Sequence, residues 1–313
     1  MKTAFLFPGQ GAQAVGMGAD IAQAFPVAGD LFDRANEIVG FDLRKACFEG
    51  PSEQLNSTTV SQPAIFVTSA ALLEVLRTRP ATADLRPDVT AGLSMGEYTA
   101  LYAAGVISFE DGLRLVQKRG QAMQAAADAT EGSMVSIIGL DEETVQKLCD
   151  EARGGEVLEP VNFNCPGQIV VSGSLGACER AEQLAEKYGA AKAVRLAVAG
   201  AFHTELMAGA AEALRDALRQ SRIAEPGPVR TIANIDAAYY RTADEIVNGL
   251  TRQLTQAILW HKCMERLLAD GVETFYEIGP GRVLTGLMKR IHRKTRVTNI
   301  SDLGSLKAAV GEA

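Results

Sequence analysis

The chain has 313 residues, of which 47% are hydrophobic, and its 38 acidic and 31 basic residues give a net charge of −7. This length and apolar content fit one large domain, or a large domain that carries a small one, and they argue against a disordered chain. The acidic balance argues against a nucleic-acid-binding protein that relies on general attraction to phosphates.

The first apolar run, residues 4–7, is too short for a signal peptide or a membrane span, and Gly9 and Gln10 follow at once. We therefore expect a cytoplasmic protein that does not span a membrane. The cysteines form no C-x-x-C pair and have too few histidines near them for a zinc site. We expect no metal, and reduced, mostly buried thiols at Cys47, Cys149, Cys165, Cys178 and Cys263.

Strands and helices alternate through the first part of the chain. The apolar patterns predict a strand at 3–7, helices at 19–25, 30–38 and 64–77, a strand at 88–91, and helices at 97–104 and 109–123. Alternation of this kind favours a mostly parallel sheet.

The order of the predicted strands and helices changes between residues 132 and 200. The patterns predict a strand at 133–138, a helix at 142–152, strands at 157–162 and 168–172, a helix at 177–188 and a strand at 193–198. This order, βαββαβ, is typical of a ferredoxin-like unit. We therefore predict a small ferredoxin-like domain at residues 132–199.

After residue 200 the chain returns to long helices. The patterns predict helices at 205–220 and 246–268 and strands at 229–233 and 274–278, whereas the tail after residue 302 carries no clear signal. The predicted fold class is α/β, with the small domain inserted into a large α/β-hydrolase-like domain that has a parallel-sheet core. Residues 1–131 and 200–313 would form this large domain.

A serine follows the second predicted strand in the pattern Gly92-x-Ser94-x-Gly96. This pattern matches a nucleophile elbow, in which a sharp strand-to-helix turn holds the serine in a strained conformation between small neighbours. The main-chain N–H of Met95 would lie beside the nucleophile at the positive end of the helix. A structural alternative is a serine that caps the helix between turn glycines.

His203 is the best candidate for a catalytic base among the three histidines. It lies between a predicted strand and a predicted helix, whereas His261 lies inside a predicted helix and His292 lies in a basic segment. The positive helix end would keep the His203 ring neutral and available as a base. The alternative is a polar loop residue without a catalytic role.

Arg119 falls within the apolar sector of the helix predicted at 109–123. An unpaired buried charge costs on the order of several kcal/mol, so this guanidinium needs a partner. Either an internal carboxylate or the carboxylate of a ligand would satisfy it, and periodicity does not choose between them.

The loop Gly9-x-Gly11-x-x-Ala14 follows a strand and matches a relaxed dinucleotide-binding fingerprint, so a nicotinamide-dependent enzyme is a rival hypothesis. The required acidic residue should end a second strand, but Asp30 and Asp33 lie in a predicted helix. A tight turn explains the glycines but leaves Gln10 unexplained. An amide donor beside an elbow serine would complete an oxyanion hole.

Five segments occur together in an order that resembles a known family. They are Phe7-Pro8-Gly9-Gln10-Gly11, Gly92-Leu93-Ser94-Met95-Gly96-Glu97, Gln117-Lys118-Arg119-Gly120, Asn162-Phe163-Asn164-Cys165-Pro166-Gly167-Gln168 and Phe202-His203. They span nearly the whole chain, which resembles bacterial malonyl-CoA:acyl carrier protein transacylase. The resemblance implies a nucleophile, a base, two oxyanion donors and a receptor for the malonyl carboxylate, namely Ser94, His203, Gln10 with the Met95 amide, and Arg119.

The resemblance also assigns the surroundings of the site. The main-chain carbonyl of Gln253 would orient the histidine, and Phe202 would limit branching at the acyl α-carbon. Asn162, Asn164 and Gln168 would line the thioester channel, although ordinary strand and turn polarity also explains them. The family usually carries histidine where this chain has Leu93, which predicts a change in channel polarity and not a loss of chemistry.

The implied reaction is ping-pong transfer of a malonyl group from malonyl-CoA to the pantetheine thiol of acyl carrier protein, in the supply of fatty-acid synthesis. Coenzyme A is then part of a substrate, and we expect no cofactor and a monomer. A docking surface for the acidic carrier or for CoA phosphate is predicted at Lys289, Arg290, Arg293, Lys294 and Arg296, unless these residues are simply solvated.

Three alternatives remain open. The first is a trans-acting polyketide-synthase acyltransferase, and the second is a serine thioesterase or esterase, because an elbow, a base and oxyanion donors serve all of these reactions. The third is a carrier-binding module in which Ser94 is only structural.

Overall fold

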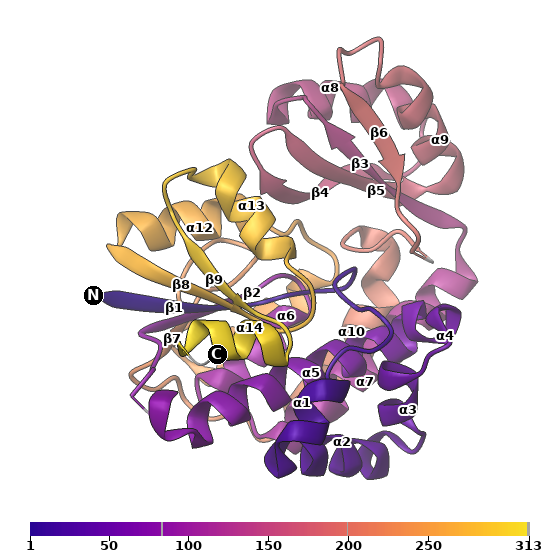
Figure 1. The fold of residues 1–313 in the computed structure, drawn as a ribbon. Coiled ribbons are helices and arrows are strands. Elements are labelled where there is room, and N and C mark those ends of the chain that lie inside the picture. The colour runs from indigo at the N-terminus through magenta and orange to yellow at the C-terminus, as the bar shows by residue number, and fades with distance from the viewer. Residues whose placement is uncertain (83, 199, 312–313) are drawn as a thin grey trace.

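The computed structural model of the chain describes residues 1–82, 84–198 and 200–311 and contains two sheets (Figure 1). The predicted domain ends at residues 199 and 313 lie outside the described residues. The larger sheet has the strand order β7-β2-β1-β8-β9, and the smaller has the order β4-β5-β3-β6.

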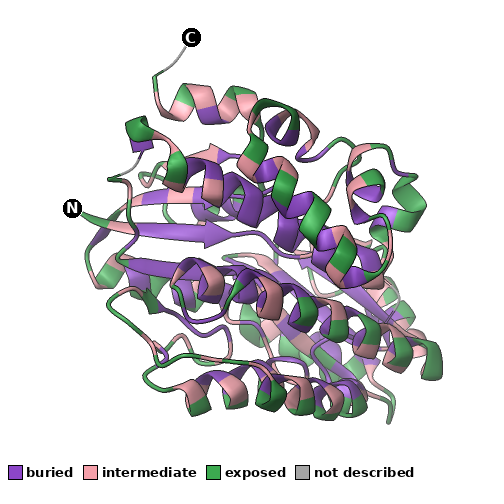
Figure 2. Ribbon diagram, turned by 90° about the horizontal axis from the view of Figure 1, so that it is seen from below, coloured by how far each residue is buried: buried purple, intermediate pink, exposed green. Residues whose placement is uncertain are grey.

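All strand pairs of the larger sheet are parallel. Its strands are β1 (Lys2–Phe7), β2 (Val89–Gly92), β7 (Arg230–Thr231), β8 (Val272–Ile278) and β9 (Val297–Ile300). The residues of β1 alternate between two apolar clusters, with Phe5 and Phe7 in one and Ala4 and Leu6 in the other. Both faces of the sheet are therefore covered, as in other parallel sheets, and Figure 2 shows the strands buried between helices.

The helices that surround this sheet come from both ends of the chain. They are α1 (Ala19–Ala24), α2 (Pro26–Val39), α3 (Leu43–Phe48), α4 (Ser52–Asn56), α5 (Thr58–Thr78), α6 (Gly96–Ala103), α7 (Phe109–Ala129), α10 (Ala208–Gln220), α11 (Ala243–Gln253), α12 (Trp260–Ala269), α13 (Val283–Ile291) and α14 (Leu303–Ala309), with short 3₁₀ turns η1 (Pro80–Thr82) and η2 (Glu205–Met207).

Helix α5 is long and apolar enough to cross a membrane, with a mean hydropathy of 1.4 over its most apolar window. However, 89% of that window is buried inside the protein, where α5 packs against α2 and α7. We therefore interpret α5 as the central core helix of the large domain.

The smaller sheet is antiparallel and forms the unit at the upper right of Figure 1. Its elements in chain order are β3 (Gly132–Ile138), α8 (Glu142–Ala152), β4 (Leu158–Cys165), β5 (Gln168–Ser174), α9 (Leu175–Leu184) and β6 (Lys192–Arg195). Val135 and Ile137 of β3 share an apolar cluster with both helices. The predicted fold class, a large α/β domain with a ferredoxin-like βαββαβ domain, is confirmed.

The single helix predicted at 246–268 is wrong. The structure has two helices, because α11 ends at Gln253 and α12 begins at Trp260. Between them Ile258 donates its N–H to Val161 O at 2.7 Å and accepts from Phe163 N at 2.9 Å. The chain leaves the helical path because these hydrogen bonds tie it to β4 of the small domain.

Smaller differences occur at the ends of elements. The helix predicted at 205–220 begins as the 3₁₀ turn η2, and the helix predicted at 177–188 ends at Leu184. The tail, for which we made no prediction, contains α14 with a capping box between Asp302 and Ser305.

Candidate active site

A cavity of about 280 Å³ opens between the large sheet and the small domain. The loop after β1, the turn after β2, helix α7, the small sheet, residues 196–198 and 202–203, and helix α13 all contribute to its wall. The structure brings most of the predicted site residues together there: Gln10, Ser94, Arg119, Asn162, Asn164, Gln168, Phe202 and His203. Met95 and Gln253 lie fully buried outside the lining.

Ser94 lies in a sharp turn between β2 and α6, with a left-handed φ of 51°. Such a conformation costs a non-glycine residue on the order of 1–3 kcal/mol. A Cβ at Gly92 would overlap the main chain of Gly96, and a Cβ at Gly96 would lie 2.7 Å from Pro8 O. Close backbone packing therefore requires both glycines of the elbow pattern.

Ser94 and His203 form a hydrogen-bonded pair, with Ser94 Oγ 3.0 Å from His203 Nε2. On the other side of the ring, His203 Nδ1 lies 2.6 Å from the Gln253 carbonyl oxygen. A carbonyl can only accept, so Nδ1 carries the proton and the lone pair of Nε2 faces Ser94.

The electrostatics favour a neutral His203. Burial, assisted by the positive charge of Arg119, lowers the pKa of His203 to about 3, although the hydrogen bond to Gln253 acts in the opposite direction. His203 is 4% exposed, so solvent does little to stabilise an imidazolium. His203 is therefore an unprotonated acceptor for the Ser94 hydroxyl proton at neutral pH.

Arg119 is only 1% exposed and faces neutral oxygens. Its Nη1 donates to Gln62 Oε1 at 3.0 Å, and its Nη2 donates to Ser94 Oγ at 3.0 Å and to Gln253 Oε1 at 3.1 Å. Arg119 forms no ion pair with any residue that the structure describes. Its charge is therefore available to an anionic group beside Ser94.

The loop that carries Gln10 packs directly against the elbow, since a Cβ at Gly9 would overlap the Leu93 carbonyl. Gln10 lines the cavity, and Met95 follows Ser94 in the chain. Neither main-chain N–H donates to an acceptor within the described residues. Main-chain amides without an acceptor are the groups from which an oxyanion hole is built.

The polar residues predicted along the channel lie on the wall formed by the small domain. Among the described residues, Asn162 Oδ1 and Asn164 Oδ1 are buried without a hydrogen-bond partner. Gln168 Oε1 accepts from Arg290 Nη1 at 2.7 Å, which ties α13 to the small sheet. Leu93 contributes an apolar side chain to the same cavity.

The sequence did not identify three buried residues that hold the elbow in place by hydrogen bonds. Glu97, Asn234 and Tyr240 are buried and hydrogen-bonded to one another and to the elbow. A buried carboxylate in the otherwise neutral helix α6 was the one available signal. Asn234 and Tyr240 belong to no motif.

Among the described residues, the glycine loop and the acidic residues after it do not have the arrangement of a dinucleotide-binding site. Asp30 and Asp33 lie within α2, and α1 begins only at Ala19, well after the glycine loop. Across residues 1–82, 84–198 and 200–311, no group of His, Cys, Asp and Glu side chains could hold a metal ion. All five cysteines are free and buried.

An elbow serine paired with a histidine, beside a buried arginine, has the groups that acyl transfer requires. A family model described as acyl transferase domain matches residues 4–312. The chain belongs to this acyl transferase family and is an acyltransferase, as predicted.

Full-length relatives make the assignment more specific. The malonyl CoA-acyl carrier protein transacylase of Bacillus subtilis is 41% identical over 310 residues, which cover 99% of this chain and 96% of the relative. That of Escherichia coli K12 is 42% identical over 308 residues, 98% of each chain. The resemblance to the bacterial malonyl-CoA:acyl carrier protein transacylases is confirmed.

Solved structures agree with this assignment. An acyl carrier protein S-malonyltransferase from Vibrio cholerae has a TM-score of 0.92 and 42% identity, covering 99% of this chain and 100% of that one. A malonyl-transacylase in complex with its type II PKS acyl-carrier protein has a TM-score of 0.95 and 40% identity, with 99% of each chain covered.

Proposed function

We propose that this enzyme transfers a malonyl group from malonyl-CoA to the pantetheine thiol of acyl carrier protein through a covalent malonyl-serine at Ser94. The observation that carries the proposal is the buried Arg119, whose Nη2 lies 3.0 Å from the nucleophile and which has no carboxylate partner within the described residues. The relatives named as malonyl CoA-acyl carrier protein transacylases support the same substrate.

In the first half-reaction, His203 Nε2 accepts the Ser94 hydroxyl proton as Oγ attacks the malonyl thioester carbonyl. The main-chain amides of Gln10 and Met95 stabilise the resulting oxyanion. The carbon–sulfur bond then breaks, and the proton on His203 passes to the departing CoA thiolate. The malonyl group remains on Ser94 as an ester.

The second half-reaction reverses the sequence with a different thiol. The pantetheine thiol of the carrier gives its proton to His203 Nε2 and attacks the malonyl ester. Collapse of the oxyanion breaks the bond to Oγ, and His203 returns the proton to Ser94. The Gln253 carbonyl, 2.6 Å from Nδ1, keeps the ring in one tautomer throughout.

Arg119 provides selectivity for a malonyl group. Its planar fork suits a bidentate bond to a carboxylate, whereas an acetyl group would leave the buried charge facing only neutral oxygens. Phe202, at the cavity wall beside the base, limits substitution at the α-carbon.

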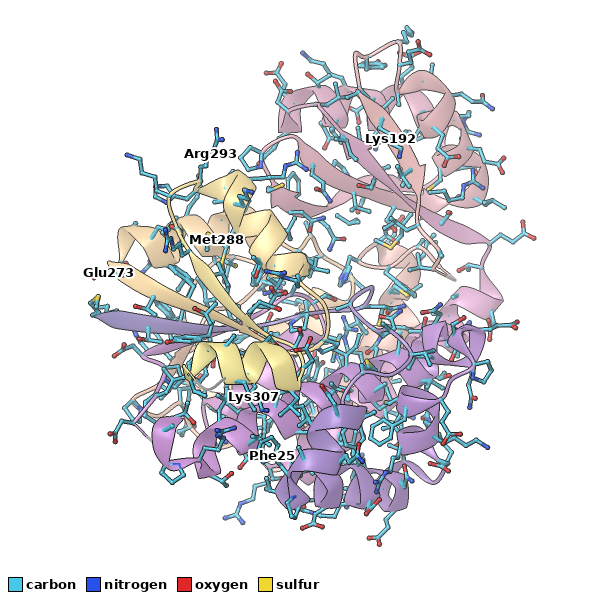
Figure 3. The ribbon with its side chains drawn as sticks, in the orientation of Figure 1. Phe25, Lys192, Glu273, Met288, Arg293 and Lys307 are labelled. Carbon is cyan, nitrogen blue, oxygen red and sulfur yellow. The ribbon has the colours of Figure 1, made fainter. Side chains whose placement is uncertain are left out.

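Helix α13, which contributes Val283 and Leu287 to the cavity wall, ends in a cluster of basic residues. Lys289, Arg293, Lys294 and Arg296 are exposed at and after the end of α13, and the Arg293 side chain extends away from the ribbon in Figure 3. Arg290 differs from them because it bonds Gln168 and the carbonyls of 166 and 167. The four exposed cations suit an acidic carrier or the phosphates of CoA.

The remaining parts of the proposal concern the setting of the enzyme. We propose a cytoplasmic monomer that needs no cofactor, binds neither nucleic acid nor membrane and supplies fatty-acid synthesis. The complex of a similar malonyl-transacylase with a type II PKS acyl-carrier protein favours a polyketide carrier as the second candidate acceptor. Competition between the two kinds of carrier for the malonyl-enzyme would distinguish them.

The proposal is tested by incubating wild type and Ser94→Ala with malonyl-CoA and recording intact and peptide masses. We expect one malonyl adduct on the Ser94 peptide of the wild type and none in the variant. Addition of holo acyl carrier protein should discharge the adduct to the carrier much faster than water does. Faster discharge to water would indicate a thioesterase, and a folded wild type that forms no adduct would indicate a binding module.

A further inference from the structure

A buried carboxylate, Glu97, lies directly behind the catalytic pair. Glu97 is 0% exposed and makes no direct ion pair with a described residue. Its Oε2 accepts from Asn234 N at 3.0 Å and from Gln253 Nε2 at 2.9 Å, and its Oε1 accepts from the hydroxyl of Tyr240. These three hydrogen bonds favour the ionised form, but burial is the larger effect and raises the pKa of Glu97 to about 7.

The contacts of Gln253 fix the orientation of its side-chain amide. Its Nε2 donates to Glu97 Oε2 and to the Ser94 carbonyl at 3.1 Å, while its Oε1 accepts from Arg119 Nη2 at 3.1 Å. A flipped amide would place its oxygen against the carboxylate and its NH₂ against the guanidinium. Glu97 and Arg119 therefore specify one orientation of Gln253 from opposite sides.

Glu97 also supports the elbow through Asn234. The Asn234 main-chain N–H donates to Glu97, while its Oδ1 accepts from Ser94 N at 2.7 Å and its Nδ2 donates to Gly92 O at 2.8 Å. The same carboxylate thus holds the residue that clamps the nucleophile and the residue that contacts the base and the arginine.

The Gln253 side-chain amide lies between Glu97 and Arg119 and hydrogen-bonds to both. A direct ion pair would occupy the guanidinium donors, which are needed on the side of the nucleophile. With Gln253 between them, Arg119 Nη2 still reaches Ser94 Oγ at 3.0 Å. The buried arginine is therefore supported without being neutralised by contact.

We propose that Glu97 is a positioning residue for malonyl selectivity, which acts by fixing the Gln253 amide in the orientation that receives Arg119. This inference rests on the proposed function, because it assumes that Arg119 binds the malonyl carboxylate. It predicts that Glu97 affects malonyl transfer more than acetyl transfer, although it touches neither acyl group.

The test compares Glu97→Gln with a matched control, Glu74→Gln. Glu74 is a half-buried carboxylate on α5 that also accepts from a tyrosine, Tyr102, at 2.7 Å, remote from the cavity lining. Rates of Ser94 acylation by malonyl-CoA and by acetyl-CoA are measured by quenched-flow mass spectrometry. We expect Glu97→Gln to lower the malonyl-to-acetyl ratio on the order of tenfold, as for loss of one charge-assisted hydrogen bond, mainly through a higher KM for malonyl-CoA.

A double-mutant cycle with Gln253→Met tests whether Glu97 acts through the Gln253 side chain. If Glu97 acts through Gln253, the double variant should lose no more selectivity than Gln253→Met alone. Additive losses, or an unchanged ratio in a folded Glu97→Gln, would overturn the proposal. If Glu97→Gln does not fold, Glu97→Asp, which keeps the charge but shortens the reach, should lower the ratio in the same direction, and an unchanged ratio there would also overturn it. A wild type that does not prefer malonyl-CoA would instead refute the proposed function.

Discussion

Replacement of Arg119 by alanine should change which acyl group the enzyme accepts. The variant loses the donors to Gln62, Ser94 and Gln253 and leaves the carboxylate of a bound malonyl group buried without a cation. Removal of one partner of a buried ion pair costs about 3–5 kcal/mol. At about 1.4 kcal/mol per tenfold, malonylation of Ser94 should slow by about 10²-fold to about 4 × 10³-fold.

Acetylation of Ser94 has no carboxylate to lose, so we expect its rate to change by no more than about tenfold. The assay is the rate of appearance of each acyl-Ser94 peptide, with thermal unfolding to confirm that the variant is folded. Arg114→Ala is the matched control, because Arg114 lies on the same helix α7 with its side chain 59% exposed. Equal losses for malonyl-CoA and acetyl-CoA would refute the reasoning, since the guanidinium would then serve the nucleophile and not the carboxylate.

Three further predictions concern stability and reactivity. The pKa of His203 is about 3 in the folded chain against 6.5 when unfolded, so its contribution to stability is complete above pH 6.5 and is lost as pH falls toward 3. Between these two pH values, the free energy of unfolding measured with urea should fall less in His203→Gln than in wild type. Gly96→Ala would overlap Phe7 O and should destabilise the protein by about 2 kcal/mol or more in a thermal melt, and an unchanged melting temperature would contradict the packing argument. Burial raises the pKa of the Cys47 thiol to about 12 and that of Cys263 well above its usual value, so native protein should resist iodoacetamide until denaturant is added, as counted by mass spectrometry.

The fold was predictable wherever the signal was local. The strands near residues 3–7 and 88–91 are short buried apolar runs, and α7 shows a clear apolar face, so single-sequence patterns suffice. The break at 254–259 was not predictable, because Ile258 leaves the helix to bond β4 across the domain junction. Strand β9 also escaped prediction, since three of its four residues are only partly buried and give no alternating pattern.

The residues of the candidate site also divide into those with a local sequence signal and those without one. Ser94 was predicted because the elbow is a local pattern, and Arg119 because a charge interrupts a helical face. Asn234 carries no such signal, since only the tertiary fold brings it to the elbow. Glu97 stood next to the motif, but its partners lie on segments more than a hundred residues away.

The two site residues with strained backbones, Ser94 and His203, are also held in place by hydrogen bonds from neighbouring residues. Ser94 and His203 both have left-handed backbones, with φ values of 51° and 65°, and each conformation costs about 1–3 kcal/mol. Such residues persist only where their surroundings over-determine them, and here Asn234 clamps the serine while the Gln253 carbonyl holds the histidine. Because Glu97 accepts from both Asn234 and Gln253, one buried carboxylate links the two strained positions. In the proposed mechanism, Ser94 and His203 are therefore aligned before any thioester arrives, so that little reorganisation is left for the reaction itself.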